Sequence, residues 1–463
     1  MNKIKALCIV LSIYVSIISC NKSDYLNVKP DQSLIVPHSL KDFQAILDYD
    51  NVMNGSVLGV IPNFGEAASD NYYVLDNVLN NSDILHTKLY TWSLDDSYDK
   101  IFYDWSYPYQ NIFYANTVLD GLKKVTVSNS DQSTFNNIMG QALFFRSFMF
   151  YSLAQIFAPQ YDKTSASTDL GIPLRVSSDV SEKITRASVK ETYDQILTDL
   201  KASMHFLPDF PLYYTRPSKW AAYAMLARVY QTMGLYDSSL AYCNACLQLR
   251  NTLMDYNSDL NIVSGTFTVK RFNPEVIFQS LLMNLDHILI ASPANTKVDS
   301  ILFASYNIND KRRSIFFLTL APGHIFRGSY DGTRTQFGGL ATDEIYLTRA
   351  ECFARLGNKD AAISDLNSLM IKRWSNNGTW LPYTAIDAPD ALRQILIERR
   401  KELLMRGLRW TDLRRLNKEG ANITLTRIVN GQTYTLEPNS LRYTFLLPAT
   451  VISFNPGMIQ NPR

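Results

Sequence analysis

Two separate segments of the chain share a spacing of small and aromatic residues that restricts the possible fold more than any other feature. In residues 220–249, and again in residues 343–369, these side chains recur at steps of three and four positions. Such steps place them along one face of a helix. Gly234 and Gly357 interrupt the two segments where a turn would reverse the chain. Each segment is therefore predicted to form two helices in close contact, within a fold that is mainly α.

Aligned on their glycines, the two segments resemble the tetratricopeptide helix pair. Gly357 lies 123 residues after Gly234, so the pairs are not tandem repeats and long insertions separate them. Insertions in repeat scaffolds commonly lie on one face, which is often the binding face. The main insertion, residues 250–341, is predicted to hold turns and short strands, and residues 51–106 are predicted to form a second irregular region.

Further helices are predicted from apolar spacing and capping residues. Apolar side chains at helical spacing predict buried helices over residues 109–122 and 142–157, and Trp105 is interpreted as a core residue leading into the first of them. Ser188, with Glu191 three positions later, predicts a capped helix that runs to about residue 206. Residues 387–417 are predicted to form one scaffold helix that starts at Asp387, with opposite charges pairing along it.

Cys243 and Cys246 have the spacing of a redox or metal pair. A single pair of this kind, without a second pair or a nearby histidine, is weak evidence for zinc. Both residues fall in the first helix-pair segment, where small buried side chains are expected. We therefore predict that they are packing residues, with a redox or disulfide role as the alternative.

The N-terminus has the pattern of an export signal. Lys3 and Lys5 precede an apolar run from residue 6 to residue 18, which is too short to span the ~30 Å hydrocarbon layer of a membrane. Residues 17–20 resemble the lipobox of bacterial lipoproteins, in which the cysteine is lipidated and the signal is cleaved just before it. Cys20 is therefore predicted to be the lipid attachment site. The alternatives are an ordinary secretory signal with an incidental cysteine, or Cys20 as half of a disulfide.

Composition gives no support for nucleic-acid binding, and it is rich in tyrosine. The chain has 45 Lys and Arg against 43 Asp and Glu, a net charge of +2, which gives no field that would attract nucleic acid. Hydrophobic residues make up 46% of the chain, which suits a large core. Tyrosine is abundant, with 27 residues, and its ring offers a flat apolar face together with a polar tip.

The usual marks of catalysis and of metal binding are missing from the sequence. The five histidines have no zinc-ligand spacing, and there is no nucleophile elbow or phosphate loop. Asp95 and Asp96 are the one conspicuous pair of neighbouring carboxylates, and they are a weak candidate for glycoside hydrolysis. We therefore predict no catalytic residues, no metal and no cofactor, with a secreted glycoside hydrolase as a distant alternative.

Several stretches that span nearly all of the chain after Cys20 resemble the SusD/RagB family of surface lipoproteins. The most specific of them lie in the C-terminal part, at residues 344–351 and 398–403 and at the ending 447–461. The other matching positions, in chain order, are Tyr25-Leu26, Pro30, Trp105, Tyr109, Ile112, Ala115-Asn116, residues 140–146, Gly171-Ile-Pro173, residues 216–219, Ala221-Ala222, Ala227-Arg228, residues 275–278, residues 310–312, Asn367, Arg373, Arg409, Asp412 and Arg415.

The resemblance implies a scaffold of four tetratricopeptide-like helix pairs, with loops and short strands that build one binding face. It also implies a function. The protein would sit on the outer membrane at the cell surface, held by its lipid anchor, capture an oligosaccharide, and deliver it to a TonB-dependent transporter of the SusC type. The alternatives are a peptide ligand, as in RagB-like members, or an interaction scaffold without any small ligand.

Candidate ligand-binding residues lie in the two irregular regions. Sugars need aromatic faces for their C–H sides and polar groups for their hydroxyls. The segment with Asp70, Tyr72 and Tyr73, together with Trp92, offers that combination, and Asp70 and Tyr72 fall where members of the family that the chain resembles place ligand contacts. The second set of candidates lies in the main insertion and consists of Arg327, Tyr330 and Arg334.

The predicted organisation is a signal peptide followed by one SusD-like domain. The signal peptide covers residues 1–19, and the domain covers residues 20–463. Within the domain, the predicted parts are a tether at 20–40, an N-terminal helical part at 41–249, the insertion at 250–341 and a C-terminal helical part at 342–463.

Overall fold

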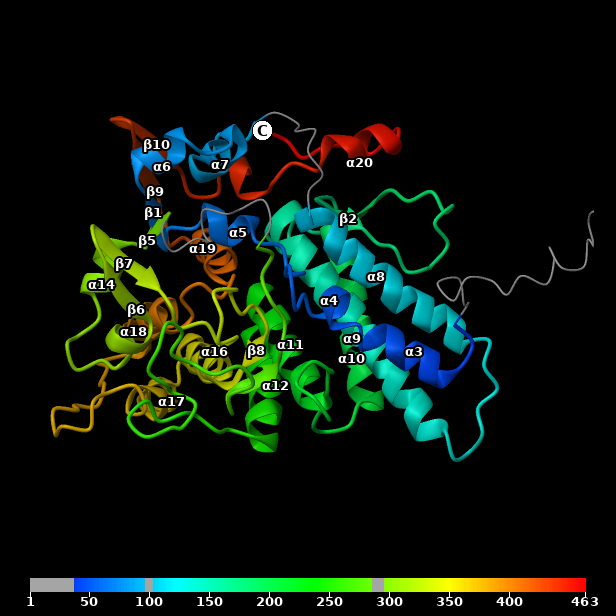
Figure 1. Ribbon diagram of the computed structural model, residues 1–463, viewed down its shortest axis with the longest axis horizontal. Coiled ribbons are helices and arrows are strands. Elements are labelled where there is room, and N and C mark those ends of the chain that lie inside the picture. Colours follow the sequence, from blue (N-terminus) through cyan, green and yellow to red (C-terminus); the bar gives the residue numbers. More distant parts are fainter. Residues whose placement is uncertain (1–36, 96–102, 285–294) are drawn as a thin grey trace, which may run out of the picture. The chain divides into compact units, whose positions relative to one another are not determined.

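The computed structural model describes residues 37–95, 103–284 and 295–463. The signal peptide, Cys20, most of the predicted tether, Asp96 and His287 lie outside the described residues. The part from Leu40 to Arg463 forms one compact unit that is mainly helical, as predicted (Figure 1).

A series of packed helices forms the scaffold. The two predicted helix pairs are confirmed, and Gly234 and Gly357 turn the chain with φ angles of 72° and 84°. Each helix of the series packs against the next one along the chain. The helices of the series are α8 (Tyr103–Leu122), α9 (Gln132–Phe157), α10 (Val189–Phe206), α11 (Lys219–Thr232), α12 (Tyr236–Leu249), α16 (Thr342–Arg355), α17 (Lys359–Met370) and α18 (Ala388–Glu402).

The capped helix is confirmed, and two others extend beyond the prediction. The Ser188 side chain accepts a bond from the amide of Glu191, whose carboxylate accepts from the amide of Ser188, so α10 begins with a complete capping box. Helix α8 begins at Tyr103 and α9 at Gln132, both earlier than expected. The first turn of α9 is polar and carries little apolar periodicity. Trp105 is buried within α8, which confirms it as a core residue.

The C-terminal end of α9 is completed by groups from distant parts of the chain. The last turn has no basic residue of its own to satisfy its free carbonyls. The guanidinium of Arg414 donates to the carbonyls of Gln155 and Ala158, and Arg186 and Asn461 both donate to the carbonyl of Phe157. These contacts fix the end of the chain against the scaffold.

The predicted long helix over residues 387–417 is wrong as a single element. The structure has two helices there, α18 and α19 (Arg409–Lys418), and the chain turns between them through Met405 and Gly407, which have φ angles of 58° and 73°. Neither angle is compatible with a right-handed helix. The predicted start of α18 is confirmed, because Asp387 caps it by accepting a bond from the amide of Asp390.

The charges on α18 and α19 pair mainly with other elements rather than along the helix. Arg415 pairs with Glu351 of α16 at 2.6 Å, and Arg409 pairs with Asp70 at 2.7 Å. Arg312 contacts both Glu398 and Glu402. These two helices therefore join the two halves of the chain through buried ion pairs.

The described residues of the insertion at 250–341 form short strands and short helices. They include α14 (Ser300–Ala304), α15 (Arg312–Ile315) and strands β4 to β8. All strands of the described residues pair in antiparallel twos: β1 (Tyr72–Val74) with β5 (Thr296–Val298), β2 (Leu170–Pro173) with β3 (Arg186–Ser188), β4 (Val276–Phe278) with β8 (Leu340–Ala341), β6 (Phe317–Leu320) with β7 (Gly323–Phe326), and β9 (Leu425–Val429) with β10 (Gln432–Leu436).

In its described part, the region predicted to be irregular, residues 51–106, consists of short helices separated by loops and the short strand β1. Such helices are too short for a periodic pattern to stand out in the sequence. They and the remaining short elements are α3 (Leu40–Leu47), α4 (Asp50–Met53), α5 (Phe64–Ala68), α6 (Asp76–Asn80), α7 (Ile84–Tyr90), the 3₁₀ helix η2 (Leu441–Tyr443) and α20 (Ala449–Phe454).

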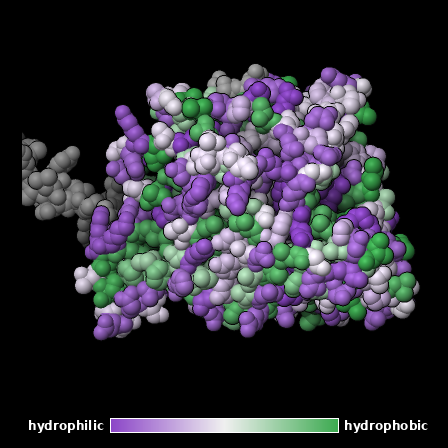
Figure 2. Space-filling view, turned by 180° about the vertical axis from the view of Figure 1, so that it is seen from behind, coloured by the Kyte–Doolittle hydropathy of each residue, from purple (hydrophilic) through white to green (hydrophobic). Residues whose placement is uncertain are grey.

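Cys243 and Cys246 are fully buried free thiols, which confirms that they pack in the core. Burial raises the pKa of both thiols, which keeps them protonated and unreactive. Among the described residues, no helix has the length and apolar character needed to cross a bilayer. On the face seen in Figure 2, hydrophilic side chains cover much of the surface and hydrophobic ones lie between them in separate groups.

Candidate functional site

Asp70 holds the loop before β1 against the scaffold. Its two carboxylate oxygens accept bonds of 2.7 and 2.8 Å from Arg409, and Arg400 lies 3.0 Å from one of them. Burial alone would raise the pKa of Asp70, but the guanidinium groups of Arg409 and Arg400 outweigh it and hold that pKa well below its usual range. The carboxylate is therefore a permanent anion that is already occupied by two arginines.

Tyr72 and Trp92 are core residues around Arg427. They are 4% and 5% exposed, and the Trp92 indole donates to the carbonyl of Ala68 at 2.9 Å. The guanidinium of Arg427 lies 5.2 Å from the Tyr72 ring and 4.7 Å from the Trp92 ring. Because both rings are buried, the prediction that Tyr72 and Trp92 contact a ligand is corrected, and they are core residues.

Tyr330 is likewise enclosed, in a cluster of buried charges. It is 1% exposed, and its hydroxyl lies 2.6 Å from a carboxylate oxygen of Glu275, to which it donates, and 3.1 Å from one of Asp343. The guanidinium of Arg406 lies 4.6 Å from its ring. Tyr330 joins the insertion to α16, and the prediction that it contacts a ligand is corrected on the same ground of burial.

Tyr73 is the one aromatic candidate that remains partly exposed. Side chains alternate along a strand, so Tyr73 points away from the core that receives Tyr72 and Val74. It lies opposite Lys297 of β5, and a Cβ at Gly323 would stand only 2.7 Å from its hydroxyl. Glycine at the start of β7 therefore makes room for the Tyr73 side chain.

A second group of partly exposed rings begins at the next residue of β7. The imidazole of His324 stacks on the ring of Phe303, with 3.4 Å between centroids, and the guanidinium of Arg313 lies 4.3 Å from the Phe303 ring. The exposed hydroxyl of Thr319 bonds Nδ1 of His324 at 3.2 Å. We call Tyr73, Phe303, Arg313, Thr319 and His324 the β7 face. Because side chains alternate along a strand, Tyr73 lies on the Gly323 side of β7 and the other four residues lie on the His324 side.

The four β7-face residues that come from the insertion were not predicted as ligand contacts. A signal was nevertheless available, because two short apolar runs flank Pro322 and Gly323, and such a pattern indicates a hairpin. Burial lowers the pKa of His324, and the nearby Arg313 lowers it further, so the ring is neutral at pH 7. A neutral imidazole presents both a flat face and hydrogen-bonding nitrogens.

Arg327 and Arg334 lie away from this group. Arg327 follows the opposite end of β7, about 13 Å along the strand from Gly323 at ~3.3 Å per residue. It donates to the carbonyls of Gly265 and Ser314 and so stabilises the insertion. Arg334 is exposed on the following loop.

The described residues form no recognisable metal site. They contain no group of three or more histidine, cysteine or acidic side chains placed to hold a metal ion. Asp95 is paired with Arg442 at 2.6 Å, and hydrogen bonding to that arginine lowers its pKa. A general acid needs a raised pKa, so Asp95 has the opposite character.

Three family models match the chain. A model described as starch-binding and associating with the outer membrane matches residues 24–231, and a model of the SusD family matches residues 342–463. A tetratricopeptide repeat model matches residues 221–252, which hold α11 and α12.

Individual relatives agree with these models. A SusD-like protein, P2, from Formosa agariphila is 23% identical over 375 residues, which cover 67% of this chain and 71% of the relative. A SusD superfamily protein of known structure from Bacteroides thetaiotaomicron has a TM-score of 0.74 at 20% identity, and covers 92% of this chain and 100% of its own. A SusD-like carbohydrate binding protein of known structure from Bacteroides vulgatus has a TM-score of 0.68 at 20% identity, with coverage of 91% and 98%.

Proposed function

Since this chain belongs to the SusD/RagB family, we propose that it captures an oligosaccharide at the outer surface of the cell and passes it to a SusC-like TonB-dependent transporter. The family is one of carbohydrate-binding proteins associated with the outer membrane. The observation that carries the proposal is the β7 face, where partly exposed rings lie beside hydrogen-bonding groups.

The β7 face has the chemistry that a sugar requires. Tyr73 on one side of β7 and His324 on the other each offer a partly exposed ring for the C–H side of a pyranose, whereas the Phe303 ring is covered by His324 and Arg313. The Thr319 hydroxyl and the Arg313 guanidinium supply groups for its hydroxyls. Tyr73 and His324 stand on the paired strands β1 and β7, so neither ring would have to become ordered before it bound a sugar.

The ligand test uses a panel of oligosaccharides and peptides in calorimetric titration. Replacing Tyr73→Ala removes one ring of the β7 face, so we expect the affinity for the captured saccharide to fall at least tenfold. Tyr49→Ala is the matched control, since Tyr49 is 49% exposed on the surface but does not belong to the β7 face. Equal affinities in both variants would move the site elsewhere, and binding of peptides alone would favour the RagB-like alternative.

The lipid anchor is proposed from Cys20, which lies outside the described residues. Several acyl chains, each methylene contributing about 0.8 kcal/mol, would hold the protein on a bilayer. We expect Cys20→Ala to release the protein from the membrane fraction while its saccharide affinity stays unchanged. Fractionation with labelled palmitate, followed by titration of the released protein, checks both parts. Loss of affinity would instead give Cys20 a structural role.

The transporter is the remaining part of the proposal. Co-purification from detergent-solubilised outer membranes, with the Tyr73→Ala variant as a control for ligand-dependent capture, tests it directly. Recovery of a TonB-dependent transporter with both forms supports a stable complex. Recovery of the lipoprotein alone would contradict the delivery step but would leave the binding step standing.

A further inference from the structure

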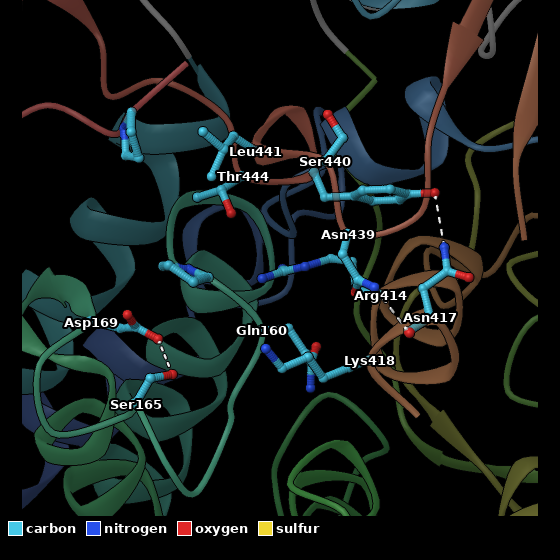
Figure 3. A pocket seen from close by; sticks show the side chains of 13 residues that line it. Gln160, Ser165, Asp169, Arg414, Asn417, Lys418, Asn439, Ser440, Leu441 and Thr444 are labelled. Carbon is cyan, nitrogen blue, oxygen red and sulfur yellow. Dashed lines mark hydrogen bonds between the residues drawn. The ribbon is translucent and has the colours of Figure 1, made fainter. Parts of the chain in front are cut away.

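A hollow that is remote in sequence from the β7 face lies between the connection from α9 to α10 on one side and α19 with the chain that follows it on the other. Its volume is about 330 Å³. Figure 3 shows its lining, to which the first connection contributes Gln160, Ser165 and Asp169 and the C-terminal part contributes Arg414, Asn417 and Lys418. The volume lies near the lower end of the range of pockets that hold small organic ligands.

Arg414 supplies this pocket with a buried positive charge. The residue is 3% exposed, and two of its five N–H groups donate to the carbonyls of Gln155 and Ala158 at the end of α9. Among the described residues, no carboxylate forms an ion pair with it. Burial lowers its pKa to about 10, which still leaves it charged at pH 7. The positive charge of Arg414 is therefore stabilised by carbonyl dipoles and not by a carboxylate. An anionic group in the pocket would form an ion pair with it.

The rest of the lining consists largely of amides and hydroxyls. The Gln160 amide donates to the carbonyl of Thr232 at 2.7 Å, while its buried Oε1 has no partner within the described residues. The Ser165 hydroxyl bonds Asp169 at 2.6 Å, and Lys418 pairs with Asp162 at 2.8 Å. Several donors and acceptors around one hollow suit a ligand with many hydroxyl groups.

We propose that this pocket is a second binding site, for an acidic sugar unit of the hexuronate type. The sugar carboxylate would lie between Arg414 and Lys418, and its hydroxyls would reach Gln160 and Asp169. This combination of groups favours a uronate over a neutral sugar and over a small inorganic anion. A neutral sugar would leave the cation unmatched, and a small inorganic anion would leave most of the 330 Å³ and its amides without contacts.

The probes are glucuronate and galacturonate, with glucose and galactose as neutral counterparts, titrated against the purified mature chain and followed by NMR. We expect both uronates to bind at least tenfold more tightly than the neutral sugars. Lys418→Gln should weaken uronate binding at least fivefold. Lys190→Gln is the matched control because Lys190 also forms an exposed ion pair, with Asp194 at 2.6 Å, but it does not line the pocket. Arg414 is left intact because it holds the end of α9.

A second variant tests the pocket by shape. Leu441 lines the pocket and is 52% exposed, so Leu441→Trp should narrow the hollow without disturbing the core, and uronate affinity should fall while the melting temperature is kept. The proposal is overturned if wild-type protein binds no uronate up to about 50 mM, or if Lys418→Gln matches its control. Uronate binding lost in Tyr73→Ala but kept in Leu441→Trp would also overturn it, while leaving the proposed function intact.

Discussion

Glu351 shows how strongly single buried charges contribute to this fold. It is fully buried on α16, where Arg415 contacts both of its oxygens at 2.6 and 2.8 Å and Arg355 contacts one at 2.7 Å. Burial alone would raise the pKa of Glu351, but Arg415 and then Arg355 outweigh it and lower the pKa to about 2. An unfolded chain would have the ordinary value of 4.5.

This difference fixes the sign of a pH effect. Because the folded pKa is the lower one, the stabilisation is fully present above pH 4.5 and is lost as the pH falls toward 2. At about 1.4 kcal/mol per pKa unit, it amounts to about 3 kcal/mol. We expect Glu351→Gln to lower the free energy of unfolding at pH 7 by about that amount, and the gap from wild type to close in acid. Urea denaturation at pH 7 and in acid measures the difference in the free energy of unfolding between wild type and Glu351→Gln. The control variant Glu182→Gln, on an exposed loop, should show no difference from wild type.

The candidate site shows what the sequence can and cannot indicate at the scale of a residue. Tyr72 and Tyr73 are neighbours of one chemical type. Strand alternation predicts that they point to opposite sides, but it does not predict which of the two points inward. That choice depends on Arg427, which donates to the carbonyl of Tyr90 across 337 positions of sequence. Partners so distant leave no local pattern. For the same reason, Trp92 and Tyr330 resemble surface aromatics until their partners are known.

At the scale of elements, periodic segments were predictable and interruptions were not. The capping box of α10 rests on contacts within a few residues, and the two helix pairs rest on periodic patterns within their own segments. Both appear where their patterns predict them. The break between α18 and α19 depends instead on tertiary contacts. The amide of Gly407 donates to Glu66 at 2.9 Å, which fixes the turn from outside the segment.

Gly407 therefore provides a test of that break. Its φ angle of 73° disfavours any side chain, and an added Cβ would stand 2.7 Å from a methyl carbon of Leu282. We expect Gly407→Ala to lower the free energy of unfolding by about 2 to 4 kcal/mol, from backbone strain and overpacking together. Gly420→Ala is the control, since its φ of 91° is similar but its Cβ would meet nothing within 4 Å. It should lose only about 1 kcal/mol. If both variants lost the same free energy of unfolding in urea denaturation, the Leu282 side chain would be able to move away from the added Cβ at no cost.

On the scale of the whole unit from Leu40 to Arg463, the two segments matched by SusD-type models are not separate folding units. The N-terminal match ends at residue 231 and the C-terminal match begins at residue 342. Arg427 of β9 nevertheless donates to the carbonyls of Ser69 and Tyr90, and Arg228 of α11 pairs with Glu344 of α16 at 2.6 Å. The core is thus built from both ends of the chain.

Substitution of Arg427 tests whether both ends of the chain build one core. Arg427→Met keeps much of the side-chain volume but leaves the buried carbonyls of Ser69 and Tyr90 without their donor, at about 1 to 3 kcal/mol each. We expect a loss of about 3 kcal/mol or more in the free energy of unfolding. Arg393→Met is the control, because the Arg393 side chain is 65% exposed in a local pair with Asp390.

The same variant distinguishes one cooperative unit from two. If the C-terminal part closes the N-terminal loops, tryptophan fluorescence and far-ultraviolet circular dichroism should report a single shared urea transition, shifted to lower urea in Arg427→Met. The β7 face would lose order in the same step, since β1 follows directly on the loop that Arg427 holds at Ser69. A separate early transition in the variant, with saccharide affinity preserved, would show that the N-terminal loops keep their structure without the C-terminal hairpin.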